Sequence, residues 1–247
     1  MGRGIQGAVL DLLGAAVLDL EVVGVREVCN GTMRRVTFSG DQTLPETLQG
    51  PAAWLRLWFP SADGSAVQRG YTISDLSPNA DACDIDFFKH ENGGPASRWA
   101  NTAKQGDRLQ AQVMGSRPFQ PGEGLKGVVL YGDETAFPAV CSIIRSLPAG
   151  VDASVVLGGT HDLSAFLPKR EDQCIKVRFT GREAPASCVE RVLEDLRHHG
   201  EGFDNWQFWA AGERAAVQAM RPLVSRRYRF ARKSAHIQAY WIAGRAF

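Results

Sequence analysis

Several features that mark specialised protein classes are scarce in this sequence. Its five cysteines are scattered and form no CxxC pair, so we expect reduced thiols and neither an iron-sulfur cluster nor another metal site. Basic and acidic side chains number 28 and 27, and this balance argues against nucleic acid as a main partner. The apolar N-terminal stretch is broken by Asp11 and Asp19. We therefore expect no export signal, no integral membrane segment and a cytoplasmic location.

The composition is that of an ordinary globular protein. A chain of 247 residues with 44% hydrophobic and 22% charged side chains is long enough for one large domain or two modest ones. Apolar residues recur at helical spacing from Ile5 to Leu20, so we predict an amphipathic helix within residues 1–19 that packs as an added flank. A membrane-surface role is the alternative, but its polar face carries acids rather than lysine and arginine.

Residues 20–122 are predicted to form an antiparallel barrel. Six short apolar segments are separated by turns rich in Gly, Pro, Asp and Asn, which is typical of a small six-stranded barrel. In the segment 53–59, strict alternation places Ala53, Leu55, Leu57 and Phe59 in the core and Trp54, Arg56 and Trp58 outside. The predicted strands are 22–28, 34–39, 53–59, 69–74, 83–90 and 108–114.

A second domain is predicted over residues 123–247. The stretch 118–127 is rich in Gly and Pro and is interpreted as a linker. After it, strand-like and helix-like segments alternate, which indicates a Rossmann-like parallel sheet built from βα units. The strands are expected at 127–131, 153–157, 174–180, 206–210 and 236–241, with helices near 135–147, 185–199 and 212–225.

Two motifs in the predicted barrel indicate a flavin site. Arg69, Tyr71 and Thr72 are predicted to project from one edge of a strand, where they supply a cation for phosphate, a ring to stack on an isoalloxazine and a hydroxyl for its N5. Further on, two glycines precede the predicted start of a helix, whose amides suit a pyrophosphate. This stretch, made of Gly94, Pro95, Ala96 and Ser97, is predicted to bind the pyrophosphate through its backbone amides, and a plain helix start without a ligand is the alternative.

The chain resembles the siderophore-interacting flavoproteins of the ferredoxin-NADP reductase superfamily. The resemblance rests on the order and spacing of RGYT from Arg69, DIDFFKH from Asp84, GGPASRWA from Gly93, GDET from Gly132 and AAGE from Ala210. It implies FAD as cofactor, NAD(P)H as electron donor and reduction of a ferric siderophore. Tyr71 and Thr72 are the implied catalytic residues. Asp86, Phe88 and His90 are implied to line the cofactor side of their strand.

The resemblance also implies a nucleotide site in the second domain. Asp133, Glu134 and Thr135 follow its first predicted strand, and Gly212 and Glu213 follow a later one. In open parallel sheets such positions share the ligand-binding edge. Two well-capped helices are the alternative interpretation. No G-x-G-x-x-G motif is present.

Substrate contacts are implied for Arg117, Trp241 and Arg245. The basic run of Arg226, Arg227, Arg229, Arg232 and Lys233 is either a solvated face or a rim that steers anionic chelates. Ser74 and Ile242 stand where relatives usually carry basic residues. We expect a monomer, with a ferredoxin as another candidate donor. Two rival functions are an NAD(P)H-dependent flavin oxidoreductase with another acceptor and a siderophore-binding protein without catalysis.

Overall fold

The chain divides into two compact units in a computed structural model that describes residues 16–40, 42–90, 93–182, 184–199 and 202–244. The first unit runs from Met1 to Phe119 and the second from Gln120 to Phe247. The boundary thus falls inside the stretch that we interpret as a linker. Among the described residues, no helix has the length and apolar character needed to cross a membrane.

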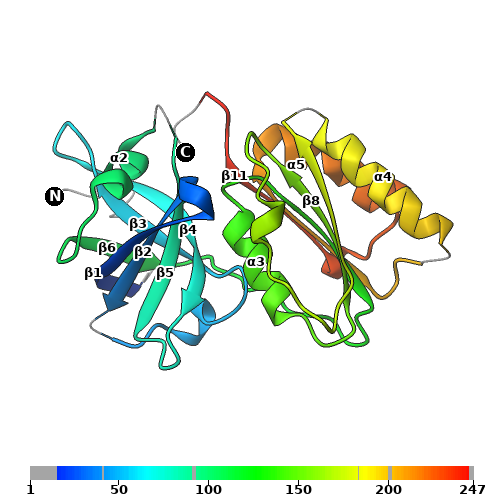
Figure 1. Cartoon of the computed structure of the whole chain (residues 1–247), viewed down its shortest axis with the longest axis horizontal. Coiled ribbons are helices and arrows are strands. Elements are labelled where there is room, and N and C mark those ends of the chain that lie inside the picture. The colour runs from blue at the N-terminus through cyan, green and yellow to red at the C-terminus, as the bar shows by residue number, and fades with distance from the viewer. Residues whose placement is uncertain (1–15, 41, 91–92, 183, 200–201, 245–247) are drawn as a thin grey trace. The chain divides into compact units, whose positions relative to one another are not determined.

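The first unit is a closed antiparallel barrel (Figure 1). Its strands follow one another around the barrel in the order β1-β2-β5-β4-β3-β6. One helix, α2 (Pro95–Thr102), lies between the last two strands in sequence and packs on β3, β2 and β5. The strands are β1 (Ala16–Val28), β2 (Met33–Gly40), β3 (Trp54–Pro60), β4 (Ala66–Leu76), β5 (Ala82–Phe88) and β6 (Arg108–Val113). This confirms the predicted six-stranded barrel.

Alternating side chains build the barrel core. On β3, Leu55, Leu57 and Phe59 are completely buried, as the period-2 pattern predicts. Trp58 departs from that prediction, since it is only 4% exposed. Its indole Nε1 donates a hydrogen bond to Gln112 Oε1 of the neighbouring strand β6 at 2.9 Å. A polar partner across the sheet therefore lets this tryptophan be buried on the face that we expected to be exposed.

The predicted N-terminal helix is wrong for its last residues. Residues 16–19 belong to β1, while residues 5–15 lie outside the described residues. Leu18, Leu20 and Val22 are buried at strand spacing, and β1 pairs with both β2 and β6. The apolar residues of this stretch satisfy a helical and a strand period at once, and pairing with two neighbouring strands selects the strand.

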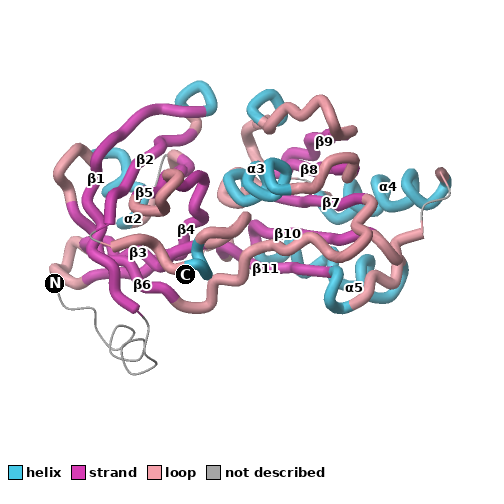
Figure 2. Tube along the Cα trace, turned by 90° about the horizontal axis from the view of Figure 1, so that it is seen from below, coloured by secondary structure: helices cyan, strands magenta, loops and turns pink. Residues whose placement is uncertain are grey.

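The second unit contains a five-stranded parallel sheet in the order β11-β10-β7-β8-β9 (Figure 2). Helix α3 packs against β7, whereas α4 and α5 pack against each other and the sheet (Figure 1). The strands are β7 (Gly127–Gly132), β8 (Asp152–Gly158), β9 (Ile175–Gly181), β10 (Trp206–Glu213) and β11 (Ala235–Trp241). The helices are α3 (Phe137–Ser146), α4 (Pro185–His198) and α5 (Arg214–Pro222). The predicted Rossmann-like arrangement is confirmed.

The core of this sheet explains its sequence pattern. All six residues of β7 are buried, because this central strand is covered on both faces. Val129 and Tyr131 share one face and join a cluster with Val189 and Val217, which belong to α4 and α5. The carboxyl ends of the parallel strands consequently meet at one edge, next to the N termini of the helices.

All five cysteines are free thiols in the structure. Cys83, Cys141 and Cys188 are buried, whereas Cys29 is half-buried and Cys174 is exposed. Burial raises the pKa of the Cys83 thiol to about 12, so this group is inert at neutral pH.

Candidate functional site

Arg69 and Tyr71 lie on the same face of β4 and begin the candidate flavin cradle. The Arg69 guanidinium is half-buried and donates to the carbonyl of Gln68 at 2.6 Å, and it has no carboxylate partner among the described residues. The Tyr71 ring packs on Phe87, with ring centroids 4.4 Å apart, and on Phe59 at 5.7 Å. Burial keeps the pKa of Tyr71 well above its usual value, so the phenol is neutral. A cation without an acidic partner beside an aromatic ring suits a phosphate-bearing aromatic ligand.

Thr72 lies on the opposite face of β4, which corrects the expectation that it shares one edge with Arg69 and Tyr71. The reason is the pleat, since adjacent residues of a strand point to opposite faces and Thr72 pairs with Trp54 of β3. The Thr72 side chain is 6% exposed, and its Oγ1 has no hydrogen-bond partner among the described residues. An unpartnered buried hydroxyl is costly. It marks a place where a ligand can supply the missing bond.

The polar residues of β5 are used differently. Both oxygens of Asp86 accept hydrogen bonds from Arg35 of β2, at 2.6 and 2.7 Å. Asp86 is therefore committed to an ion pair within the barrel wall. His90 lies beyond the end of β5 and is exposed, with its ring edge-to-face on Phe88 at 4.6 Å. Ser74 accepts a hydrogen bond from the amide of Asp86 at 3.2 Å, so this residue ties β4 to β5.

The start of α2 offers backbone amides. Gly94 is its N-cap, Pro95 occupies the first turn, and no side chain of the described chain caps this end. A Cβ at Gly93 would collide with the side chain of Ser97, whereas a Cβ at Gly94 would meet nothing within 4 Å among the described residues. The first-turn amides of Ala96 and Ser97 therefore have no side-chain cap, and uncapped amides of this kind bind anions at other phosphate-binding helix starts.

The barrel residues fit FAD. Arg69 and the α2 amides would hold its phosphates, and Tyr71 would contact the ring system. The orphaned Thr72 hydroxyl is the most direct sign of fit, because the protein leaves a buried polar atom for a ligand to satisfy.

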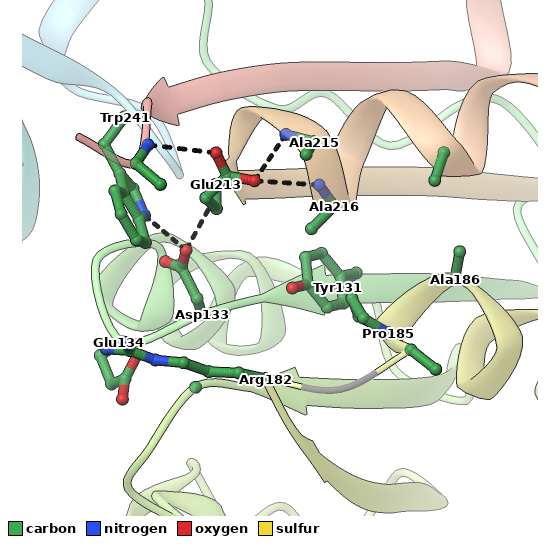
Figure 3. A pocket seen from close by; sticks show the side chains of 14 residues that line it. Tyr131, Asp133, Glu134, Arg182, Pro185, Ala186, Glu213, Ala215, Ala216 and Trp241 are labelled. Carbon is green, nitrogen blue, oxygen red and sulfur yellow. Dashed lines mark hydrogen bonds between the residues drawn. The ribbon is translucent and has the colours of Figure 1, made fainter. Parts of the chain in front are cut away.

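In the second unit, Asp133 connects three segments at the carboxyl edge of the sheet. Its Oδ1 accepts from Thr135 N at 3.0 Å, Thr135 Oγ1 at 2.5 Å and Ala136 N at 3.3 Å. Its Oδ2 accepts from Glu213 N at 2.8 Å and from Trp241 Nε1 at 2.7 Å (Figure 3). Burial raises the pKa of this carboxyl, while the hydrogen bonds from Thr135 and Trp241 act against that rise. Asp133 thus holds β7, β10 and β11 in register.

Glu134 is equally occupied by the protein. Its Oε1 accepts from Thr160 N at 2.5 Å, Thr160 Oγ1 at 2.9 Å and His161 N at 3.1 Å. Burial opposes ionisation, but the backbone and hydroxyl donors outweigh it and lower the pKa of Glu134. Gly159, with φ of +123°, is required here because a Cβ at that position would overlap the Glu134 carboxylate. Glu134 therefore shapes the loop after β8.

Asp133, Glu134 and Glu213 border a pocket of about 470 Å³ at this edge (Figure 3). Glu213 Oε2 caps α5 by accepting from Ala215 N at 2.5 Å and Ala216 N at 3.1 Å. Gly212 has φ of +144°, and a Cβ there would lie 2.6 Å from Asp133 Oδ2. The GDET and AAGE motifs thus lie together at one edge of the sheet, and their carboxylate oxygens accept hydrogen bonds from backbone amides of the chain.

Sequence reasoning missed several residues that line this pocket. Tyr131 forms part of its floor, and Arg182 brings a cation from the segment after β9. Small residues from the first turns of α4 and α5, including Pro185, Ala186 and Ala216, form another part of the wall. Their position directly after predicted strands was the available signal, because that is where sheet-edge ligands bind.

The predicted substrate residues have separate places. Trp241 lines the pocket of the second unit, Arg117 is exposed in the first unit, and Arg245 lies outside the described residues. In the basic run, Arg227 forms ion pairs with Glu190 and Glu194 of α4. Arg226, Arg229, Arg232 and Lys233 are exposed.

A closed antiparallel barrel followed by a helix-covered parallel sheet defines the ferredoxin reductase-like class of folds. A Neisseria gonorrhoeae ferredoxin NADP+ reductase structure with bound FAD and NADP shares this fold at 14% identity, with a TM-score of 0.65 over 91% of this chain and 99% of that one. Residues 125–244 match the siderophore-interacting protein family, and residues 61–115 match the siderophore-interacting FAD-binding domain. The chain belongs to the siderophore-interacting protein family, and the prediction of a FAD-binding barrel is confirmed.

Individual relatives support this assignment. The ferric acinetobactin reductase of Acinetobacter baumannii is 30% identical over 81% of this chain and 70% of its own length. The siderophore-interacting protein structure from Acinetobacter baumannii is 27% identical, with a TM-score of 0.77 over 94% of this chain and 92% of that one. The mycobactin import ATP-binding/permease protein IrtA of Mycolicibacterium thermoresistibile is 34% identical over the whole chain. The chain spans 27% of that relative's length.

Proposed function

We propose that this chain is a ferric-siderophore reductase that uses FAD and NAD(P)H. The observation that carries the proposal is the buried Thr72 hydroxyl, which lacks a partner among the described residues and lies inside the segment that matches the FAD-binding domain. The ferric acinetobactin reductase, which is similar over most of this chain, supports the choice of substrate class.

FAD would supply two-electron reduction by hydride and one-electron release, chemistry that suits a one-electron acceptor such as Fe(III). The residues of this chain bind and orient. Arg69 and the α2 amides hold phosphate charge, Tyr71 places a neutral ring against the cofactor, and Thr72 supplies a hydroxyl. No side chain has to transfer a proton for iron reduction itself. Fe(II) prefers hard oxygen donors less than Fe(III) does, so reduction weakens the chelate.

The pocket of the second unit is the proposed donor site. It lies at the carboxyl ends of the parallel strands, where nucleotides bind in open α/β sheets. Tyr131 and the alanines offer apolar area for a flat ring, and Arg182 offers charge for a phosphate. Because nicotinamide nucleotides are intracellular, a cytoplasmic location is part of the same proposal. We also propose that the enzyme is a monomer. A ferredoxin donor remains the rival.

The test is anaerobic stopped-flow reduction of the FAD-loaded protein with NADH and with NADPH, followed by mixing with a panel of ferric chelates. Bleaching of flavin absorbance by either nucleotide and its recovery on adding a ferric siderophore are the expected results. A protein that purifies without flavin and binds none supports the non-catalytic rival. Reduction without reoxidation by any ferric chelate supports a flavin oxidoreductase with another acceptor.

Substrate charge is testable in the same assay. Exposed Arg117, Arg226, Arg229, Arg232 and Lys233 are proposed to attract anionic chelates. Turnover of an anionic ferric chelate should then fall as salt rises past about 0.1 M, where the Debye length is about 10 Å. A neutral chelate of similar size is the control. Equal salt dependence for both chelates contradicts steering by these residues.

A further inference from the structure

The carboxylate of Glu213 occupies backbone amides that face the pocket of the second unit. Its Oε2 lies 2.5 Å from Ala215 N and 3.1 Å from Ala216 N, and both alanines line the pocket (Figure 3). Helix N-terminal amides of this kind are the usual binding groups for ligand phosphates. At the start of α5, the Glu213 carboxylate already occupies these amides, so a ligand phosphate that enters the pocket meets a carboxylate there.

Glu213 is also held from a second direction. Its Oε1 accepts a hydrogen bond from Ala243 N at 3.2 Å, and its own amide donates to Asp133 Oδ2 at 2.8 Å. The side chain therefore bridges the start of α5 and the segment after β11. A phosphate that reached the α5 amides would have to displace the Glu213 carboxylate, which accepts hydrogen bonds from three backbone amides.

The turn before α3 is closed in the same manner. Asp133 Oδ1 accepts from the amides of Thr135 and Ala136, so a second set of amides at this edge is already used. Glu134 adds a third acid to the lining, and Arg182 is the sole cation among the described lining residues. Next to the start of α5, the lining thus offers the carboxylates of Asp133 and Glu213 and no cation among the described residues.

We propose that Glu213 is a specificity-determining residue that keeps ligand phosphates away from the start of α5, an inference that rests on the proposed donor site. A phosphate and a carboxylate that compete for the same amides repel each other strongly in a partly buried site. A bound dinucleotide therefore places its phosphates toward Arg182. The acid lowers affinity for the polyanionic donor and leaves affinity for uncharged parts of the ligand unchanged.

The test uses the full-length, FAD-loaded protein and isothermal titration calorimetry with NADP+, which does not react with oxidised flavin. Glu213→Gln removes the charge, and Glu213→Ser removes it while keeping a favourable N-cap for α5. Both variants should bind NADP+ about tenfold more tightly than the wild type. Glu213→Asp keeps the charge and a good cap, so it should bind as the wild type does.

Nicotinamide riboside, which has no phosphate, separates charge exclusion from a structural effect. Its heat of binding at matched concentrations should be the same for the wild type and all three variants. A change for both ligands indicates that the pocket has been rearranged, which overturns the proposal. If Glu213→Gln fails to fold by circular dichroism, the capped Glu213→Ser variant decides.

The remaining outcomes distinguish this inference from the proposed function. Equal NADP+ affinity in the wild type, Glu213→Gln and Glu213→Ser overturns the role of Glu213 while the donor site stands. Absence of binding in every form, with both NADP+ and NAD+ titrated in the same way, overturns the donor site itself, and the role of Glu213 with it.

Discussion

Thr72 shows how one atom can report a missing ligand. The barrel buries its hydroxyl and offers it no partner among the described residues, although a valine of the same shape would be cheaper to bury. Strand β2 of the same barrel contains a contrasting threonine, because Thr37 Oγ1 donates to Asp84 at 2.6 Å. The two residues allow a matched comparison.

Thr72→Val should stabilise the flavin-free protein by about 1 kcal/mol, because it removes an unsatisfied hydroxyl. The same change should weaken FAD binding about threefold to tenfold, the value of one neutral hydrogen bond. Urea unfolding and flavin fluorescence titration measure the two effects. Thr37→Val should lower the stability of the flavin-free protein, because its hydrogen bond to Asp84 is lost, and should leave FAD affinity unchanged. Unaltered FAD affinity in Thr72→Val rules out a contact between this hydroxyl and the cofactor.

Glu134 makes the second unit sensitive to acid. Its folded pKa lies below the ordinary value of 4.5, so its contribution to stability is fully present above that pH and is lost as pH falls through the folded pKa. Glu134→Gln should therefore be less stable than the wild type by about 1 kcal/mol at pH 7, and the gap should close in acid. Thermal unfolding from pH 7 to pH 3 measures it.

The control for Glu134 is Glu171→Gln, which changes an exposed glutamate of the same unit. It should leave the pH profile of the wild type unchanged. A stability gap between Glu134→Gln and the wild type that stays constant down to pH 3 would contradict the role of the carboxylate.

At the scale of elements, the two glycines before α2 differ in what they contribute. A Cβ at Gly93 would collide with the Ser97 side chain, so the packing of the chain itself requires glycine there. No described atom lies within 4 Å of a Cβ at Gly94. Gly94 has φ of −70°, which any residue adopts, so the structure of the protein alone does not require glycine there. A ligand that approaches the backbone closely is a reason to keep it.

Gly94→Ala should change the stability of the flavin-free protein by less than about 0.5 kcal/mol. FAD affinity should fall about tenfold, as expected when one charge-assisted hydrogen bond to the pyrophosphate is lost. The measurements are denaturant unfolding without flavin and fluorescence titration with it. Gly202→Ala, another glycine with free space around a Cβ, should change neither quantity. Wild-type FAD affinity in Gly94→Ala places the pyrophosphate elsewhere.

Among these elements, the positions of the strands were easier to predict than the environment of individual strand residues. The segments 34–39 and 108–114 agree closely with β2 and β6, because alternation and turn residues mark them locally. Residues 16–19 satisfied two periods at once, and only pairing with β6 decides between them. Trp58 could not be assigned from its own segment, since its partner Gln112 is far away in sequence.

At the scale of the whole molecule, each unit has its own sheet and its own core. FAD binding by the first unit should therefore be separable from nucleotide binding by the second. The amide of Phe119 donates to the carbonyl of Pro51 at 2.8 Å, which closes the first unit near its C-terminal end. A fragment that ends at Gly122 keeps this contact and the whole barrel. Residues 123–247 contain every lining residue of the donor pocket.

The 1–122 fragment should bind FAD with reduced affinity and should not be reduced by NADH or NADPH, because it lacks the pocket. Dithionite should still bleach its flavin, since chemical reduction needs no nucleotide site. Circular dichroism must first show a β fold, so that a failure of NAD(P)H to reduce the flavin is not caused by misfolding. Flavin absorbance under anaerobic conditions is the readout. Reduction of a folded fragment by NAD(P)H at the full-length rate places the donor site outside the second unit.

The sequence by itself determined the order of elements, the change from barrel to parallel sheet and the motifs that belong to the family, because periodicity and turn chemistry are local properties. Only the tertiary structure decided what the motif side chains do. Asp133 and Glu134 bind distant amides at Glu213 and Thr160, and Thr72 points away from Arg69. Arg182 became a pocket residue because parallel strands bring their carboxyl ends to one edge, whatever their separation along the chain.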